Sequence, residues 1–311
     1  MTELDLARHS RLIDPQLHVW GWEVPVYLFL GGMAAGLMIV TSLLAARRPE
    51  RSPAARWLAF AAPVLVSVGM GALFLDLAHK LHIARFYLAL RPSSPMSWGA
   101  WILVAVYPVS LLVALGGLDE AQAARAAALA GRVGLGGLVR TARAYALRRA
   151  PALLRANLWV GVALGVYTGV LLSTLGARAL WSSALLGPLF LVSGLSTGAA
   201  FLLLFGLDAE ERRLVARWDR AAITVEAALI VLFLVGLSTG GAAGHAAAGL
   251  LLGGPFTAQF FALVVFGGLA VPLLMETLEV RLHLGATRVA PALVLAGGLA
   301  LRWILVAAGQ A

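Results

Sequence analysis

The chain has 311 residues, of which 61% are hydrophobic and 13% charged, and it contains no cysteine. This composition excludes an ordinary soluble domain, and the lack of cysteine excludes disulfides, thiolate nucleophiles and cysteine-bound iron–sulfur clusters in this chain. The net charge of +9 would suit nucleic acid, but we expect no such partner, because the basic residues lie between long apolar runs.

Eight apolar runs of about twenty residues follow the polar N-terminal segment, and each is long enough to cross the hydrocarbon core of a bilayer. They cover residues 24–46, 57–76, 98–116, 156–175, 185–206, 221–238, 258–278 and 289–308. We therefore predict an all-α, polytopic membrane protein with eight transmembrane helices in a bundle of two four-helix halves. Residues 1–311 would form a single integral membrane domain. The first twenty residues contain acids and no apolar h-region, so we expect no cleavable signal peptide.

The basic residues are distributed unevenly between the two sides of the predicted bundle. Of the 24 Lys and Arg residues, 17 lie in one alternate set of segments, 47–56, 117–155, 207–220 and 279–288, and six in the other connections and the N-terminus. The positive-inside rule then places both termini outside, in the periplasm of a bacterial cytoplasmic (inner) membrane. We interpret the long basic cytoplasmic loop, 117–155, as a solvated linker, with an amphipathic segment lying on anionic lipid as the alternative.

The first predicted span opens with GWEVPVYLFLGGMAAG, residues 21–36. Glu23 and Tyr27 are four residues apart, so a helix places both side chains on one face. Gly32 and Gly36 have the same spacing further in, which allows a second helix to approach closely. The pattern predicts a membrane helix with polar groups at its outer end and a tight helix contact near its middle.

The second span ends in LFLDLAHKLHIARFY, residues 73–87. Asp76, His79 and Lys80 share one helical face there. The connector RPSSPMSWGAW, residues 91–101, follows. Its prolines interrupt the helix, and its Ser and Trp side chains offer hydrogen-bond donors. The outer end of the second span is therefore predicted to be polar.

Two further polar residues lie inside later spans. Tyr167 is about 12 Å from the outer end of the fourth span, and Arg302 is about 9 Å from the outer end of the eighth. Arg302 either extends to the membrane surface or pairs internally with Asp76 or Glu23, and we favour the pair. Because ionisable side chains inside a membrane usually face the protein interior, a shared pocket is predicted from Glu23, Tyr27, Asp76, His79, Tyr167 and Arg302.

The inner half of the predicted bundle carries Glu226, Glu276 and Glu279. We favour a structural role for them at the interface, with a proton route from the cytoplasm as the alternative. Gly194 and Gly198 in the fifth span are interpreted as a helix-packing pair. None of the six histidines lies near the middle of a predicted span, so a haem held by two histidines across the bilayer is not expected.

An apolar cavity with an acid, tyrosines, a histidine and an arginine near the outer surface suits a quinone. The tail of a quinone favours lipid, its carbonyl oxygens require donors, and its redox chemistry exchanges protons with groups such as carboxylates. These residues alone do not separate a quinone pocket from the site of a secondary transporter. A passive membrane anchor without a pocket is a third possibility.

Several motifs, in order along nearly the whole chain, resemble the NrfD/PsrC family of polysulfide-reductase-like membrane subunits. They are WGWEVPVYLFLGGMAAG, FLDLAHKLHIARFY, SPMSWGAWIL, YTGVLLST and GGLALR, between residues 20 and 302. The resemblance implies an eight-helix subunit without haem or iron–sulfur cluster of its own. It would exchange electrons between a membrane quinone, menaquinone or ubiquinone, and an extracytoplasmic four-cluster ferredoxin-like subunit that serves a molybdopterin or multihaem catalytic subunit.

The resemblance also assigns residues, since Glu23, Tyr27 and Tyr167 occupy places that match the family's quinone pocket. Many relatives have another polar residue or histidine at the position of Tyr27, and a DLGRPxRF version of the segment that begins at Asp76. Our hypothesis gives proton exchange to Glu23 and Asp76, and quinone binding to Tyr27, Tyr167, His79 and Arg302. The outer connectors 77–97 and 239–257 would dock the partner, so the protein would act as a subunit of an oxidoreductase.

Overall fold

The computed structural model describes residues 20–76, 91, 94–174, 178–282, 285 and 287–311. Within these ranges the regular structure is helical throughout, without a strand. Eight helices in the same ranges are long and apolar enough to cross a membrane. The prediction of an all-α polytopic membrane protein with eight spans is confirmed.

The spans fall into two sets of four along the chain. The first group consists of α2 (Glu23–Arg47), α3 with α4 (Pro53–Leu58 and Ala61–Asp76), α6 (Pro95–Gly117) and α9 (Ala150–Ser173). The second group consists of α10 (Leu186–Leu203), α11 (Ala209–Thr239), the continuous segment α13, η2 and α14 (Thr257–Gln259, Phe260–Ala270 and Val271–Arg281) and α15 (Val289–Gln310). The segment η2 has π-helical hydrogen bonding. Shorter helices outside the spans are α7 (Glu120–Gly131), α8 (Gly136–Arg148) and α12 (Gly241–Leu252).

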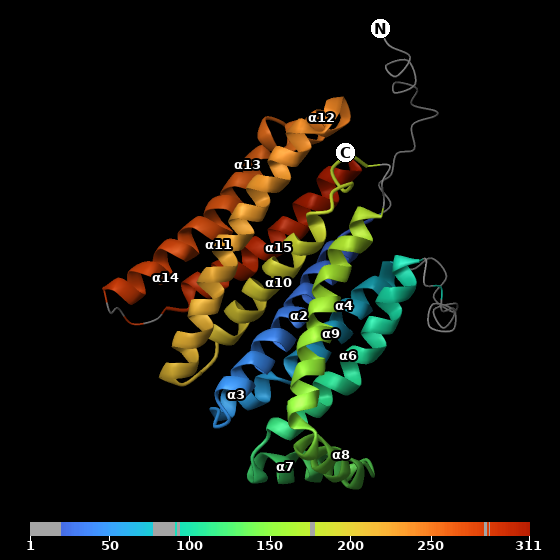
Figure 1. Ribbon diagram of the computed structural model, residues 1–311, viewed down its shortest axis with the longest axis vertical. Helices are drawn as coiled ribbons and strands as arrows, with labels where there is room; N and C mark the ends of the chain where they lie inside the picture. The colour runs from blue at the N-terminus through green and yellow to red at the C-terminus, as the bar shows by residue number, and fades with distance from the viewer. Residues whose placement is uncertain (1–19, 77–90, 92–93, 175–177, 283–284, 286) are drawn as a thin grey trace.

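The two groups meet along α2 and α10, which lie side by side at the centre of the bundle (Figure 1). Helices α4 and α9 pack on α2, and α6 packs on α9, whereas α11 and α15 pack on α10. The end that holds α12 and the C-terminus is called the upper end below, and the end that holds α3, α7 and α8 the lower end (Figure 1). The start of α2 and the end of α15 both lie at the upper end.

Glycines allow the central helices to touch backbone to backbone. A Cβ at Gly36 would collide with the carbonyl group of Gly194, and a Cβ at Gly198 would lie 2.5 Å from the carbonyl carbon of Gly36. Gly32 faces Gly194 in the same way, with 3.7 Å between the position of its missing Cβ and the Gly194 Cα. The predicted packing roles of these four glycines are confirmed, because they form one crossing between the two groups.

The span α11 begins twelve residues earlier than predicted, at Ala209 instead of residue 221. Asp208 caps it, since its carboxylate accepts hydrogen bonds from the backbone N–H groups of Glu210 and Glu211. The buried Glu211 side chain in turn accepts a 2.8 Å hydrogen bond from the Ser52 N–H, at the start of α3. A charged sequence therefore continues as helix, and it brings Asp219 into the interior of the second group.

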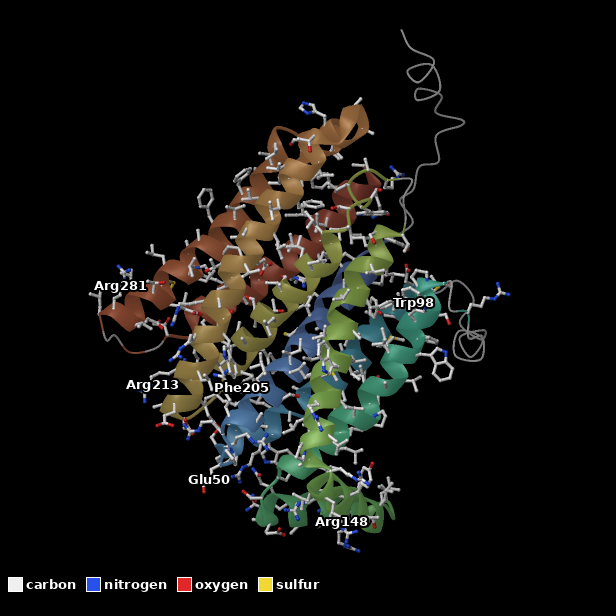
Figure 2. The ribbon with its side chains drawn as sticks, viewed as in Figure 1. Glu50, Trp98, Arg148, Phe205, Arg213 and Arg281 are labelled. Atoms are coloured by element: carbon white, nitrogen blue, oxygen red, sulfur yellow. The ribbon has the colours of Figure 1, made fainter. Side chains whose placement is uncertain are left out.

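The basic segment 117–155 contains two helices and the start of a third, where a solvated linker was the favoured interpretation. Helix α7 begins with a capping box between Asp119 and Gln122. Arg143 of α8 pairs with Glu120 at 2.9 Å, and Arg56 of α3 pairs with Asp119 at 2.7 Å. These contacts hold α7 and α8 at the lower end of the first group, where Figure 2 labels Arg148 of α8 and Glu50, which lies between α2 and α3.

Candidate functional site

The start of α2 is held at the upper end by contacts with the last helix. The backbone N–H of Trp20 donates a 3.0 Å hydrogen bond to the Gln310 side chain, whose amide donates back to the Trp20 carbonyl at 3.2 Å. The Trp20 ring stacks on Trp181, with 5.2 Å between centroids. The indole N–H of Trp181 then donates to the Leu305 carbonyl at 2.8 Å. These contacts with Trp181 and α15 fix the position of the first turns of α2, which contain its polar residues.

A cavity of about 430 Å³ lies beside this fixed turn, between α2, α4, the start of α6 and the end of α9. Its volume falls in the range of small-molecule sites. Its wall is largely apolar, with Val24 and Leu28 from α2, and Met70 and Leu73 from α4 among the lining residues. The polar residues that line it are Tyr27, Asp76, Ser94, Tyr167 and Thr174.

Two tyrosines from different helices form parts of the cavity wall, and each packs against a glycine of a neighbouring helix. Tyr27 is 4% exposed, and its ring lies 3.6 Å from the position that a Cβ of Gly69 would occupy on α4. Tyr167 is 6% exposed and fills the space beside Gly99 on α6 so completely that any Cβ there would collide with the phenol. The Tyr167 hydroxyl makes no hydrogen bond to any described residue, so it can serve as a donor to a ligand.

Two carboxylates lie near the upper rim of the cavity. Asp76, the last residue of α4, lines it, whereas Glu23, the first residue of α2, is half-buried just outside the lining. The charge of Glu23 acts on Asp76, so the two groups are electrostatic neighbours. A pair of partly hydrated carboxylates beside an apolar cavity can exchange protons with a ligand and with the upper surface.

Apolar residues that line the cavity on α4 and α6 are exposed on the surface of the bundle. These helices pack mainly on α2 and α9 and only slightly on each other, and the lining residues Phe74 and Met96 expose 40% and 51% of their surface. About 13 Å below Asp76, the hydroxyl groups of Ser67 and Tyr107 join the two helices at 3.0 Å. Above that hydrogen bond, apolar side chains of both helices therefore extend from the cavity to the surface of the bundle.

Arg302 lies outside the cavity. It is fully buried between α10 and α15, and its guanidinium donates to the Ser193 hydroxyl, the Gly298 carbonyl and the Phe190 carbonyl. Its charged neighbour is Glu226 of α11. The expected pairing with Asp76 or Glu23 is replaced by this set of contacts, and full burial excludes an extension to the surface.

The structure thus brings Tyr27, Asp76 and Tyr167 together around one cavity, with Glu23 at its rim and Arg302 elsewhere. The predicted ligand His79 lies outside the described residues and stays a sequence prediction. Among the described residues, no group of three or more His, Cys, Asp or Glu side chains could hold a metal ion.

Asp219 was not predicted as an interior residue from the sequence, although its side chain is fully buried inside the second group. The predicted span began two residues after it, so it was counted with a cytoplasmic connection. Its spacing of seven residues from Glu226 places both acids on one face of a helix, and this spacing was the available signal. Glu276 of α14 is buried near Asp219.

Comparison with known proteins identifies a family and relatives that match nearly the whole sequence. The family described as "Polysulphide reductase, NrfD" matches residues 11–311. The chain belongs to this family. The NrfD-family protein is 31% identical over 312 residues to the C subunit of polysulfide reductase from Wolinella succinogenes, covering 94% of each protein. It is also 31% identical over 306 residues to protein NrfD of Escherichia coli K12, covering 94% of this sequence and 95% of that protein.

Membership of the NrfD family agrees with the eight apolar helices, and together they identify an integral membrane protein. The name of the Wolinella relative describes one subunit of a reductase with several subunits. The suspected NrfD/PsrC resemblance is therefore confirmed as family membership.

Proposed function

We propose that this protein is the quinone-binding membrane subunit of a respiratory oxidoreductase complex, and that it carries electrons between membrane quinone and an extracytoplasmic iron–sulfur partner. The observation that carries the proposal is the largely apolar cavity with Tyr27, Tyr167 and Asp76 in its wall. Family membership supports the same function, since a relative is a subunit of polysulfide reductase.

The cavity fits a quinone ring in size and chemistry. An apolar wall accommodates the ring, and phenol hydroxyls offer donors to the ring carbonyls. The exposed apolar side chains of Phe74 and Met96 at the cavity would guide the isoprenoid tail into lipid. A bound quinone would supply reversible two-electron, two-proton chemistry. Menaquinone and ubiquinone both meet these requirements.

The protein's own residues have separate tasks in this proposal. Tyr167 donates a hydrogen bond from a hydroxyl that Gly99 and α6 hold in position, and Tyr27 orients the opposite side of the ring. Asp76 accepts or supplies protons at the cavity, and Glu23 links Asp76 to the upper surface. Fixing these groups on helices limits their motion, which keeps donor and acceptor atoms in register with the ring.

The partner would bind at the upper end, on the side that the positive-inside rule assigns to the periplasm. The cavity lies close to that end, so a cluster held against it would be near the quinone. The expected partner is a four-cluster ferredoxin-like subunit with a molybdopterin or multihaem catalytic subunit. The sequence itself contains no cysteine to bind a cluster.

Quinol-linked turnover of the reconstituted complex tests the site. Loss of one hydrogen bond of about 1 kcal/mol predicts a fall in kcat/KM of roughly fivefold for Tyr167→Phe. Glu23→Gln should lower kcat and change its pH profile, because an amide does not exchange protons. Tyr145→Phe, on the exposed surface of α8, is the matched control and should behave as wild type.

Two outcomes would replace the proposal. Wild-type kinetics in both cavity variants, together with unchanged binding of a quinone-site inhibitor, would leave a passive anchor. Solute uptake by this protein alone in liposomes, without any redox partner, would instead identify a secondary transporter.

A further inference from the structure

A second polar region lies inside the second group, separate from the cavity. It contains three acids of which none is more than 4% exposed, Asp219, Glu226 and Glu276, together with fully buried Arg302. Two serines of α10, also fully buried, complete it: Ser193 and Ser196. Burial of this many ionisable groups among membrane helices is costly unless they neutralise one another or carry protons.

These side chains form two sets that follow each other along α10. In the upper set, Arg302 donates to the Ser193 hydroxyl, which also interacts with the Glu226 side chain. In the lower set, Ser196, one turn further along α10, donates to Asp219 Oδ1 at 3.0 Å. Together the two sets form a row from Arg302 down to Asp219, and the hydroxyl group in each set can both donate and accept.

The lower end of the row is a pair of carboxyl groups. The side chains of Asp219 and Glu276 are both buried, and each acts electrostatically on the other, so they are close neighbours. Yet Asp219 Oδ2 and both carboxyl oxygens of Glu276 are buried and receive no hydrogen bond from a donor among the described residues. Two ionised carboxylates are both acceptors, so a hydrogen bond between them exists only when one carries a proton.

Electrostatics leads to the same conclusion. Two adjacent carboxyl groups in a buried site cannot both ionise, because the two negative charges would repel each other. One proton shared between them removes this repulsion and provides a hydrogen bond for carboxyl oxygens that otherwise have no donor. The other charged groups that act on the pair are Arg220 and Glu226 from α11, Glu279 from α14 and, through Glu226, Arg302 from α15. The described part of α10 contributes only hydroxyl groups to the row.

We propose that Asp219 and Glu276 bind one proton between them and exchange it with water at the lower end of the bundle. Glu276 lies five residues, about 7.5 Å, before the end of α14 at Arg281. The half-buried Glu279 lies one turn closer to the lower surface on α14, where it accepts hydrogen bonds from Thr287. The half-buried Arg220 also acts electrostatically on Glu276. The site is a carboxyl proton-binding site of the second group, and it does not depend on what occupies the cavity.

The upper end of the row opposes passage of a proton. Arg302 keeps a fixed positive charge there, and a buried guanidinium repels a proton as it repels any cation. Protons therefore load from the lower end and stop below Arg302. This direction is opposite to that of Asp76 and Glu23, which face the upper end.

Infrared spectroscopy of the purified full-length protein, in a detergent without ester groups, tests the shared proton. Wild type should show a protonated-carboxyl stretch at neutral pH that shifts in deuterium oxide. Glu276→Gln and Asp219→Asn should each lose this band. In each variant the new amide N–H donates to the remaining carboxyl group, which can then ionise. Glu279→Gln, one turn along α14, is the matched control and should retain it. No band in wild type, or a band that survives in Glu276→Gln and Asp219→Asn but disappears in Glu226→Gln, would overturn the proposal.

Cysteine labelling tests the direction of exchange, since the natural sequence has no cysteine. In sealed vesicles of known orientation, a membrane-impermeant thiol reagent should modify Glu276→Cys slowly from the same side as Glu279→Cys. Met96→Cys, at the cavity, should react with this reagent from the opposite side or not at all. Labelling of Glu276→Cys from the Met96 side, or from neither side, would contradict access from the lower end.

Discussion

The two four-helix groups handle polar residues inside a membrane in opposite ways. The first group leaves a cavity and places Tyr27, Asp76 and Tyr167 in its wall, near the upper surface. The second group contains buried acids and Arg302, which act on one another electrostatically, and Arg302 donates a hydrogen bond to Ser193. The difference shows that polar groups around a cavity suit exchange with a ligand, whereas enclosed ionisable groups require opposite charges or bound protons.

Arg302 should be the residue on which the second group depends most. Arg302→Leu removes the positive charge that acts on buried Glu226 and the donor to Ser193. An uncompensated buried charge typically costs about 3–5 kcal/mol. We expect a large fall in the free energy of unfolding in detergent. The double variant with Glu226→Gln should recover part of it, because no lone charge then stays buried.

The control for this variant is Arg213→Leu, at an exposed position of α11. Surface replacements of this kind usually change stability by about 0.5 kcal/mol or less. Equal losses in the two variants would show that the second group does not depend on internal charge pairing.

The crossing of α2 and α10 joins the two groups, so it should respond strongly to added volume. Gly36→Ala places a methyl group against the Gly194 carbonyl, and overpacking of this kind costs about 1–3 kcal/mol. Thermal unfolding should show a lower midpoint. Gly71→Ala on α4, where a Cβ meets no atom within 4 Å, should leave the midpoint unchanged or raise it. A Gly36→Ala protein as stable as wild type would show that the helices separate easily.

The first group should tolerate a change in its cavity with less effect on folding than on binding. Gly99→Ala forces the Tyr167 phenol away from α6. A loss of about 1.4 kcal/mol in binding corresponds to a tenfold weaker affinity for a quinone-site inhibitor. The measurement is inhibitor binding to the folded variant, with Gly71→Ala as the control. Unchanged affinity in a stable Gly99→Ala protein would separate Tyr167 from the binding site.

The sequence predicted the fold well because the signals were long and redundant. Eight apolar runs and the alternation of basic segments are properties of many residues, so single errors do not change the result. The glycines of α2 and α10 were also predictable, since a four-residue spacing of small residues has one common physical use. The structure then showed that the glycines of α2 pack against those of α10.

The site was less predictable because pairing depends on how helices are rotated about their axes. Arg302 and Asp76 both fall in the outer half of the bundle, yet Arg302 faces α10 and α11 in the second group. Asp219 was missed because a charged sequence was taken as the end of a span, whereas capping by Asp208 extends α11 below the apolar run. Periodicity gives depth along one helix but not the identity of its neighbours.

The smallest effect is expected at the lower end, where charges are paired but exposed. The partner of Arg143, Glu120, has a side chain that is 89% exposed, so water already stabilises the carboxylate, and such pairs contribute about 0–1 kcal/mol. Arg143→Gln should therefore change the unfolding midpoint only slightly, with a difference that shrinks further at high salt. Denaturation at low and high ionic strength measures it. A large loss that persists in salt would mean that α8 is held by the hydrogen bond from Arg143 to the Leu118 carbonyl, and that the lower end, like the second group, depends on a buried contact of an arginine.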